Sequence, residues 1–258
     1  MIESSHWYDR AGAPAYEVRG AGGFPRPTTL RDARKLALVP SVTTVLSVIA
    51  KPQLTAWQVR QGILAALTLP RVEGETEDAY LGRIKHDGEQ QVRDAAEEGN
   101  RIHDAIECAF KGRTYPAAYR PHVEAAQRAL AEAFPDVTDW IAEASFAHVS
   151  GYGGKVDLHS PSTGIVVDWK GKDGSLDDGK KLAYDQHWQL AAYQDGLLLP
   201  RNVCANGFVS RTHPGKVVLH TWTREEIEQG SDVFHRALAL WKAMKGFDPS
   251  FSANSIAA

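Results

Sequence analysis

The stretch Gly151-Tyr-Gly-Gly-Lys-Val-Asp-Leu158, followed by a short turn and then Gly164-Ile-Val-Val-Asp-Trp-Lys170, determines the fold predicted for this chain. Its two apolar runs, separated by a Pro-Ser-Thr-Gly cluster, are typical of a β-hairpin. Asp157 lies at the end of the first run, and Asp168 and Lys170 lie at the end of the second. Because side chains alternate along a strand, Asp168 and Lys170 are expected on the same face. The sequence therefore predicts two carboxylates and an amine on adjacent strands.

This combination of side chains is typical of phosphodiester chemistry. Mg²⁺ or Mn²⁺ prefers oxygen ligands and commonly binds one or two protein carboxylates plus a substrate phosphate. The metal would polarise phosphorus and activate water. Lys170 would hold or deprotonate that water, or offset charge on the phosphate. The alternative, from this segment alone, is a solvated surface ion pair on an exposed hairpin.

Length and composition favour one large α/β unit. The chain has 258 residues, of which 43% are hydrophobic, enough for a sizeable core. No window approaches the roughly 18 to 20 apolar residues of a membrane span, and residues 1–7 lack a signal-peptide pattern, so a cytoplasmic protein without membrane partners is expected. Cys108 and Cys204 are too few for a disulfide framework or a four-thiolate iron–sulfur cluster.

The net charge of −3 is unevenly distributed. Residues 1–60 carry 8 basic against 4 acidic side chains, residues 61–148 carry 9 against 16, and residues 149–258 balance at 12 each. A basic N-terminal part would suit a polyanion such as DNA. Chance unevenness explains the distribution nearly as well.

The first 135 residues predict an arm followed by helices. Residues 1–40 are rich in Gly, Pro and Arg and are expected to form an arm or irregular hairpin with little regular structure. Ser41 is expected to cap a short helix, and a second helix is expected over 53–67. On that helix, Trp57 and Arg60 lie one turn apart, as for stacking on a base and contacting a phosphate. Ordinary core packing of Trp57 is the alternative.

A long helix predicted over 79–111 carries His103. An apolar stripe on it comprises Val92, Ala96, Gly99, His103, Ile106 and Phe110. A histidine in such a stripe is usually a satisfied core residue. However, Glu107 is close enough to hydrogen-bond its ring, and Gly99 leaves room for a metal or a close backbone approach.

The rest of the pattern predicts a helix over 121–134, strands over 140–149, 203–211 and 216–222, a helix over 182–199 and a last helix to 245. The first of these strands carries Glu143, and Thr223 with Glu226 predicts a capping box for the last helix. The helix over 182–199 places Gln189 and Tyr193 on one face. The glycine-rich, charged loop after the hairpin carries three lysines that could reach phosphates, Lys172, Lys180 and Lys181. An ordinary solvated loop without a function is the alternative.

These motifs, in this order, resemble the PD-(D/E)XK nuclease superfamily, and within it the RecB-like exonucleases of phages and of CRISPR-associated and mitochondrial genome-maintenance proteins. The four matching motifs are Gly99-x-x-x-His103, Gly154-Lys-Val-Asp157, Asp168-Trp-Lys170 and Gln189-x-x-x-Tyr193. Segments that begin at Pro40 and at Lys51 also resemble the N-terminal helical part of phage-type members. Each motif is weak alone, but the four together over about 90 residues are specific.

The resemblance implies a restriction-endonuclease-like α/β core, with a central mixed sheet flanked by helices and an N-terminal helical elaboration. It implies an arm over 1–40, a helical region over 41–135, and a nuclease core over 136–258 that forms one unit with the helical region. It further implies that Mg²⁺ or Mn²⁺ is bound by His103, Asp157, Asp168 and the main-chain carbonyl of Trp169. Lys170 would act on the water.

The same resemblance implies that Gln189 and Tyr193 line the DNA path and that Glu143 supports a second metal. The four cysteines of the iron–sulfur cluster in CRISPR-associated relatives are missing, as is a helicase segment. The expected activity is that of a metal-dependent DNA exonuclease acting on single-stranded or end-processed DNA in phage or bacterial recombination or repair. Two alternatives stay open: resection of duplex ends for a single-strand-annealing or recombination protein, and a DNA-binding or assembly module without turnover.

Overall fold

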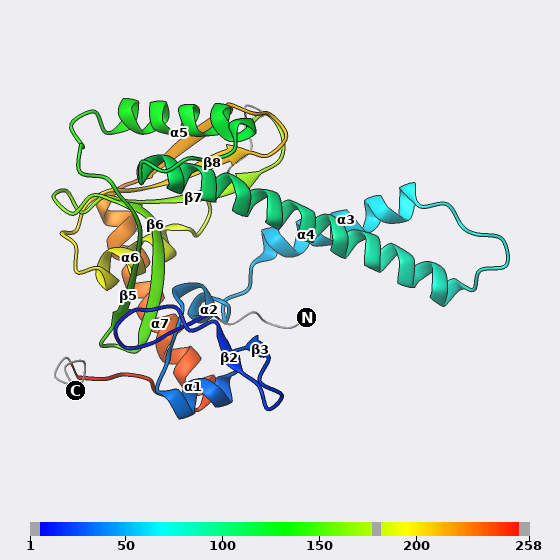
Figure 1. Cartoon of the computed structure of the whole chain (residues 1–258), viewed down its shortest axis with the longest axis horizontal. Helices are drawn as coiled ribbons and strands as arrows, with labels where there is room; N and C mark the ends of the chain where they lie inside the picture. Colours follow the sequence, from blue (N-terminus) through cyan, green and yellow to red (C-terminus); the bar gives the residue numbers. More distant parts are fainter. Residues whose placement is uncertain (1–5, 177–181, 253–258) are drawn as a thin grey trace.

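The computed structural model describes residues 6–176 and 182–252 of the chain, so the predicted phosphate contacts Lys180 and Lys181 lie outside the described residues. Its centre is a five-stranded sheet in the order β5-β6-β7-β8-β9 (Figure 1). The strands are β5 (Ile141–His148), β6 (Tyr152–His159), β7 (Val166–Lys172), β8 (Cys204–Ser210) and β9 (Val217–Trp222). Only β7 and β8 pair in parallel within this sheet, and the other neighbours are antiparallel. The α/β class and the central mixed sheet flanked by helices are thus confirmed.

The described helices lie on both faces of this sheet and outside it. They are α1 (Leu30–Leu36), α2 (Val42–Leu46), α3 (Pro52–Thr68), α4 (Glu77–Phe110), the 3₁₀ turn η1 (Ala117–Tyr119), α5 (Arg120–Ala133), α6 (His187–Gly196) and α7 (Arg224–Lys245). The predicted caps at Ser41 and at Thr223 with Glu226 are present. The helix expected over 182–199 is shorter, because residues before Gln186 form a turn and Leu198 takes a left-handed conformation after its end.

Two hydrophobic cores, one on each face, fix the sheet between its helices. Val166 packs with α2, α6 and α7, whereas Val167 and Trp169 pack with α4 and α5. Because side chains alternate, Asp168 and Lys170 must lie on the side of Val166, which is the side of α6. The packing therefore agrees with the prediction that Asp168 and Lys170 lie on the opposite face of the strand from Trp169.

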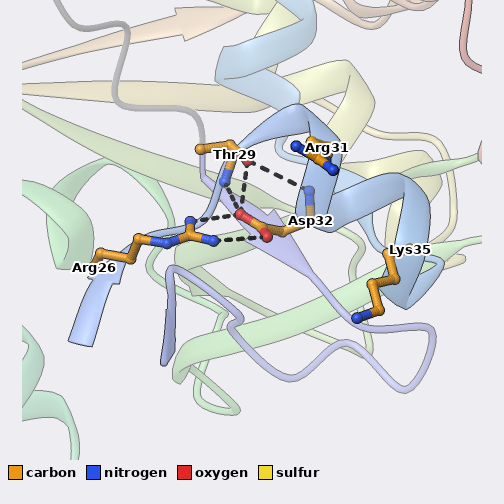
Figure 2. A pocket seen from close by; sticks show the side chains of 5 residues that line it. All are labelled: Arg26, Thr29, Arg31, Asp32 and Lys35. Atoms are coloured by element: carbon orange, nitrogen blue, oxygen red, sulfur yellow. Dashed lines mark hydrogen bonds and ion pairs between the residues drawn. The ribbon is translucent and has the colours of Figure 1, made fainter. Parts of the chain in front are cut away.

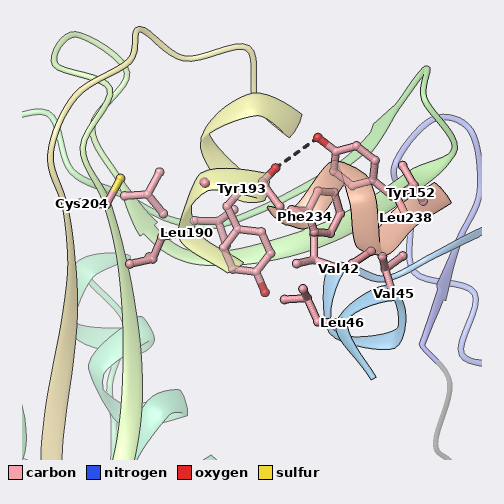
Figure 3. Close-up of a cluster of buried hydrophobic side chains, with 14 of the residues drawn as sticks. Val42, Val45, Leu46, Tyr152, Leu190, Tyr193, Cys204, Phe234 and Leu238 are labelled. Carbon is pink, nitrogen blue, oxygen red and sulfur yellow. Dashed lines mark hydrogen bonds between the residues drawn. The ribbon is translucent and has the colours of Figure 1, made fainter. Parts of the chain in front are cut away.

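The core on the α6 side holds the helices that border the site. Figure 3 shows Tyr193 of α6 toward Val42 and Leu46 of α2, with Leu190 on the side of Cys204. A hydrogen bond of 3.3 Å from the Tyr152 hydroxyl to the carbonyl of Ala192 joins β6 to α6. The position of α6 relative to the sheet is thus set by buried contacts on two sides.

The N-terminal part contains a short exposed hairpin, one of the two forms expected for residues 1–40, but its ends are packed into the core, which the sequence analysis does not predict. β1 (Trp7–Tyr8) pairs with β4 (Val39–Pro40), and β2 (Glu17–Arg19) forms a hairpin with β3 (Pro25–Pro27). Trp7 is 1% exposed, and its ring meets that of Trp241 edge-on at 6.2 Å. The Gly and Pro content hides this packing, since the partner of Trp7 lies in α7, near the other end of the chain.

α3 and α4 form a helical hairpin that projects from the body (Figure 1). The two helices approach closely where Gly62 meets Gly88, since a Cβ on Gly88 would lie 3.4 Å from the Gly62 backbone. Only the C-terminal part of α4 reaches the sheet, and its buried side chains there are Ile102, Ala105 and Ile106. Of the residues in the predicted apolar stripe, only Ile106 and the partly buried Phe110 therefore pack in this core. His103 is not part of the core. No helix among the described residues is long and apolar enough to cross a membrane.

The close packing of Trp169 on β8 yields a test of the fold. Trp169 pairs with Gly207, and a Cβ at Gly207 would lie 2.0 Å from the indole ring. Because Trp169 is 2% exposed and has no room to shift, Gly207→Ala is expected to lower the free energy of unfolding by about 3 kcal/mol, measured by urea denaturation. Gly82→Ala, on an open face of α4, is the control and is expected to be neutral or stabilising by up to about 1 kcal/mol. Equal stability of Gly207→Ala and wild type would contradict this packing.

Candidate active site

The carboxylate of Asp168 is the centre of the candidate site, and it is 3% exposed. The ammonium of Lys170 lies 2.6 Å from its Oδ2, and Asn206 Nδ2 donates to the same oxygen at 3.0 Å. Gln189 Nε2 donates to Oδ1 at 2.9 Å. Three donors from β7, β8 and α6 therefore converge on one buried acid, as a buried charge requires.

Asp168 and Lys170 shift each other's titration. Burial raises the pKa of Asp168, and the nearby charge of Asp157 raises it further, against the effect of Lys170. Burial alone would lower the pKa of Lys170, but the charges of Asp168 and Asp157 outweigh it and raise that pKa. The amine is therefore an ammonium in this arrangement, and it would act as a base only after moving from Asp168.

Asp157 lies where β6 and β7 separate. The two strands pair through Leu158 with Val167 and through His159 with Val166. Next to these pairs, Asp157 Oδ2 accepts the main-chain amide of Trp169 at 2.9 Å. Its side chain thus takes the place of a ladder hydrogen bond, and it keeps 25% of its surface exposed. Where these two neighbouring strands diverge, Asp157 is partly exposed to solvent, whereas Asp168 is buried.

His103 of α4 faces Asp157, with its Nδ1 3.7 Å from Oδ2. The ring is 31% exposed, unlike the buried Ile102 and Ile106 beside it. Among the described residues, no hydrogen bond joins this ring to Glu107, the acceptor that the sequence predicts for it. Glu107 instead pairs with Lys111 at 2.9 Å and with Arg113 at 2.6 Å.

The ligand atoms available at this site are of the types that a hard divalent cation binds. Carboxylate oxygens, a main-chain carbonyl and water are the ligands of Mg²⁺ and Mn²⁺, and an imidazole is compatible with Mn²⁺. In the described part of the chain, no three His, Cys, Asp or Glu side chains converge closely enough to hold a metal ion. The oxygens of Asp168 are occupied by Lys170, Asn206 and Gln189.

Gln189 joins the acid to the amine. Its Oε1 accepts from Lys170 at 3.2 Å, while its Nε2 donates to Asp168 and also to the Tyr193 hydroxyl at 2.8 Å. Tyr193 itself is 6% exposed and its ring packs edge-on against Phe146. Tyr193 therefore supports Gln189 from within the core, and its ring does not form an open surface for DNA.

Glu143 lies opposite Asp157 in the register of β5 and β6, between two paired positions. Its φ of 60° is left-handed, a conformation that costs a non-glycine residue about 1–3 kcal/mol. Lys111 approaches it at 2.5 Å, and Lys155 forms a very short ion pair with it. Glu143 is thus bound to two ammonium groups and, in this arrangement, not free to support a second metal.

The three remaining predicted contacts are dispersed. Trp57, half-buried, and Arg60, exposed, lie on α3 in the projecting hairpin. Lys172 follows Lys170 on the same face of β7, and its ammonium lies 5.8 Å from the Tyr184 ring centre and 5.7 Å from that of Phe208. Of the three, Lys172 is the one that lies on the same strand and face as Lys170.

Asn206 is a site residue that the sequence analysis missed. It is fully buried on β8, accepts from Trp222 Nε1 at 2.8 Å and donates to Asp168. A polar side chain inside a strand that is otherwise buried indicates a specific partner. That signal was present in the run Cys204-Ala-Asn-Gly-Phe-Val-Ser210.

A surface hollow of about 470 Å³ lies at the start of α1, away from this chemistry (Figure 2). Arg31 and Lys35 line it, but its centre is the ion pair between Arg26 and Asp32, with contacts of 2.6 and 2.9 Å. Asp32 also caps α1 through Thr29. The hollow is therefore explained by the packing of β3 on α1.

Comparison with known proteins leaves the function open. No family model and no curated protein matches the chain. Among solved structures, it is similar to "Putative exonuclease" from Eubacterium rectale, with 13% identity and a TM-score of 0.43 over 58% of this chain and 68% of the other. It is also similar to the protein SSO0001, with 13% identity and a TM-score of 0.30 over 71% and 86% of the two chains. At such low TM-scores, a function must be derived from the site itself.

The Glu143 pairs predict a pH-dependent contribution to stability. Burial would raise the pKa of Glu143, but hydrogen bonds from Lys111 and Lys155 outweigh it and lower that pKa from 4.5 to about 2. A carboxyl group whose pKa is lower in the folded protein than in the unfolded chain stabilises the fold at pH values above its unfolded pKa. This stabilisation is lost as the pH falls through the folded pKa. Glu143→Gln should therefore unfold at a lower temperature than wild type at pH 7, with a difference that shrinks between about pH 4.5 and 2. A difference in melting temperature that stays constant over this range would contradict the assignment.

Proposed function

We propose that this chain is a metal-dependent nuclease of the PD-(D/E)XK superfamily, RecB-like, that hydrolyses phosphodiester bonds in DNA. The supporting observation is the buried Asp168 beside Asp157, with Lys170 and Gln189 held against it at a solvent-accessible break in the sheet. The proposed substrate is single-stranded or end-processed DNA in phage or bacterial recombination or repair, in the cytoplasm. A single-strand-annealing or recombination protein is the proposed partner.

The electrostatics of the acid pair favour a catalytic role over a structural one. Two nearby carboxylates repel each other, and this repulsion destabilises the fold more when one of them is buried. A purely structural protein gains nothing from such a pair. A divalent cation would relieve this repulsion. The same pairing of acids with an amine is what phosphodiester hydrolysis uses.

His103, Asp157, Asp168 and the carbonyl of Trp169 would hold Mg²⁺ or Mn²⁺, which when bound polarises the phosphate and activates the attacking water. Because Lys170 is in contact with Oδ2 of Asp168, the acid can accept a cation only when this ammonium gives up the contact. Gln189 Oε1 still accepts from Lys170 and keeps the amine at the site. Lys170 would then hold the water or offset charge on the phosphate oxygens.

The first test of this function removes the acid or the amine. Asp168→Asn and Lys170→Ala are each expected to lower DNA cleavage by about 10³-fold or more, because each removes a group that acts on the reacting atoms. The measurement is a time course on end-labelled single-stranded, duplex and circular DNA with Mg²⁺, Mn²⁺ or EDTA.

In this assay, circular DNA separates exonuclease from endonuclease, and the duplex arm separates single-strand digestion from end resection. Near-ultraviolet circular dichroism of both variants confirms that they are folded. A fully active Lys170→Ala protein would contradict the mechanism. A wild-type protein that binds DNA but leaves every substrate intact would support the non-catalytic binding module.

The second test concerns His103. His103→Ala is expected to raise the Mn²⁺ concentration needed for half-maximal cleavage by about tenfold or more and to weaken Mn²⁺ binding in isothermal titration calorimetry, because it removes one ligand. His86→Ala, at an exposed position on the same helix, is the matched control. Unchanged Mn²⁺ binding and activity in His103→Ala would exclude the ring as a ligand.

A further inference from the structure

Two lysines flank Lys170 without an acid of their own. Lys172 extends from β7 on the same face as Lys170, and Lys51 is the N-cap residue of α3, where the chain leaves the body for the hairpin. The charges of both lysines interact with that of Lys170. Within residues 6–176 and 182–252, neither ammonium has an ion-pair or hydrogen-bond acceptor.

The local balance of charge around these amines is positive. Asp185 interacts with Lys51, Lys170 and Lys172, so one carboxylate serves all three. Asp168 and Asp157 also neutralise Lys170, but Lys51 and Lys172 share only Asp185 with it. Arg211 adds to the positive charge near Lys172, although it is paired with Asp173 at 2.9 Å.

The side chain of Lys172 is also oriented by two aromatic rings. Its ammonium lies over the rings of Tyr184 and Phe208, and cation–π contacts of this kind hold an amine without neutralising it. Lys51 makes no side-chain cap on α3, so its amine is not used by the helix. In the described residues neither ammonium is neutralised by an ion pair, although burial, together with the charge of Lys170, lowers the pKa of both lysines.

The strand geometry indicates which anion would suit these lysines. Residues 170 and 172 lie two positions apart on β7, which is roughly 6.6 Å along the strand. This is of the same order as the separation of successive phosphates in an extended nucleotide chain. A phosphate attacked at Lys170 would thus have its neighbour in the chain at Lys172.

We propose that Lys51 and Lys172 form a subsite for the phosphate adjacent to the one that is cleaved. The proposal rests on the proposed nuclease function, since the cleaved phosphate defines the neighbouring one. Two ammonium groups on this phosphate would set the register of the strand across Asp168 and Lys170. Each acts by positioning the substrate, and neither contacts the reacting atoms.

The binding test uses a fluorescein-labelled single-stranded 12-mer in EDTA, with anisotropy measured over a range of salt concentrations. Lys51→Gln and Lys172→Gln should each weaken binding, and the double variant should reduce the slope of log affinity against log salt by about 1.4, at roughly 0.7 for each lysine that no longer neutralises phosphate charge. Lys35→Gln, on α1, removes the same charge elsewhere and should leave the slope unchanged. Equal slopes for the double variant and wild type would overturn the proposal.

The cleavage test uses oligonucleotides in which a single phosphate is replaced by an uncharged methylphosphonate. In wild type, a neutral linkage next to the scissile bond should slow cleavage about tenfold, because the charge-assisted hydrogen bonds to that phosphate cannot form. In the double variant the same replacement should have little further effect. A full tenfold effect in the double variant would overturn the subsite and leave the nuclease proposal intact.

If wild type cleaves none of these substrates, the nuclease proposal fails, and the salt slope in EDTA still decides whether these two lysines contact phosphates. An unchanged slope then rejects the subsite as well. A reduced slope then shows phosphate binding by Lys51 and Lys172 and overturns only its assignment to a cleaved strand.

Discussion

The burial of one carboxylate constrains the architecture around it. Asp168 lies on a central strand, where water cannot solvate it, so its charge must be met by donors that other elements supply. Lys170 comes from the same strand, Asn206 from β8 and Gln189 from α6. The parallel β7–β8 pair and the crossover helix between them are thus needed for the charge as well as for the core, and removal of any donor would leave it under-satisfied.

The separation of β6 and β7 leaves Asp157 partly exposed to solvent, whereas the network around Asp168 stays buried. Pairing ends at Leu158 and Val167, and Asp157 then takes the amide of Trp169 with its own side chain. His103 reaches this break because α4 continues from the projecting hairpin onto the sheet.

The N-terminal part contributes more than a tether. Trp7 packs against α7, and Val42 and Leu46 of α2 pack against α6, so this segment supports the helix that carries Gln189. It also determines where the hairpin begins. With α2 fixed in the core, the chain turns into α3 at Lys51, whose charge interacts with that of Lys170.

Local patterns in the chain were enough to predict most elements and the order of the acid, amine and glutamine motifs, because strand alternation, turn residues and helix caps act over a few neighbours. They placed Asp168 and Lys170 on one face and predicted the capping box at Thr223. The partners of these groups emerged only from the folded structure: Asn206 on Asp168, Lys111 and Lys155 on Glu143, and the burial of Tyr193 and Trp7. Helical periodicity marks which residues share a face, but not where along α4 the sheet begins, so His103 faces the site and not the core. Contacts between residues far apart in the chain depend on how the elements pack, and local sequence patterns do not determine that packing.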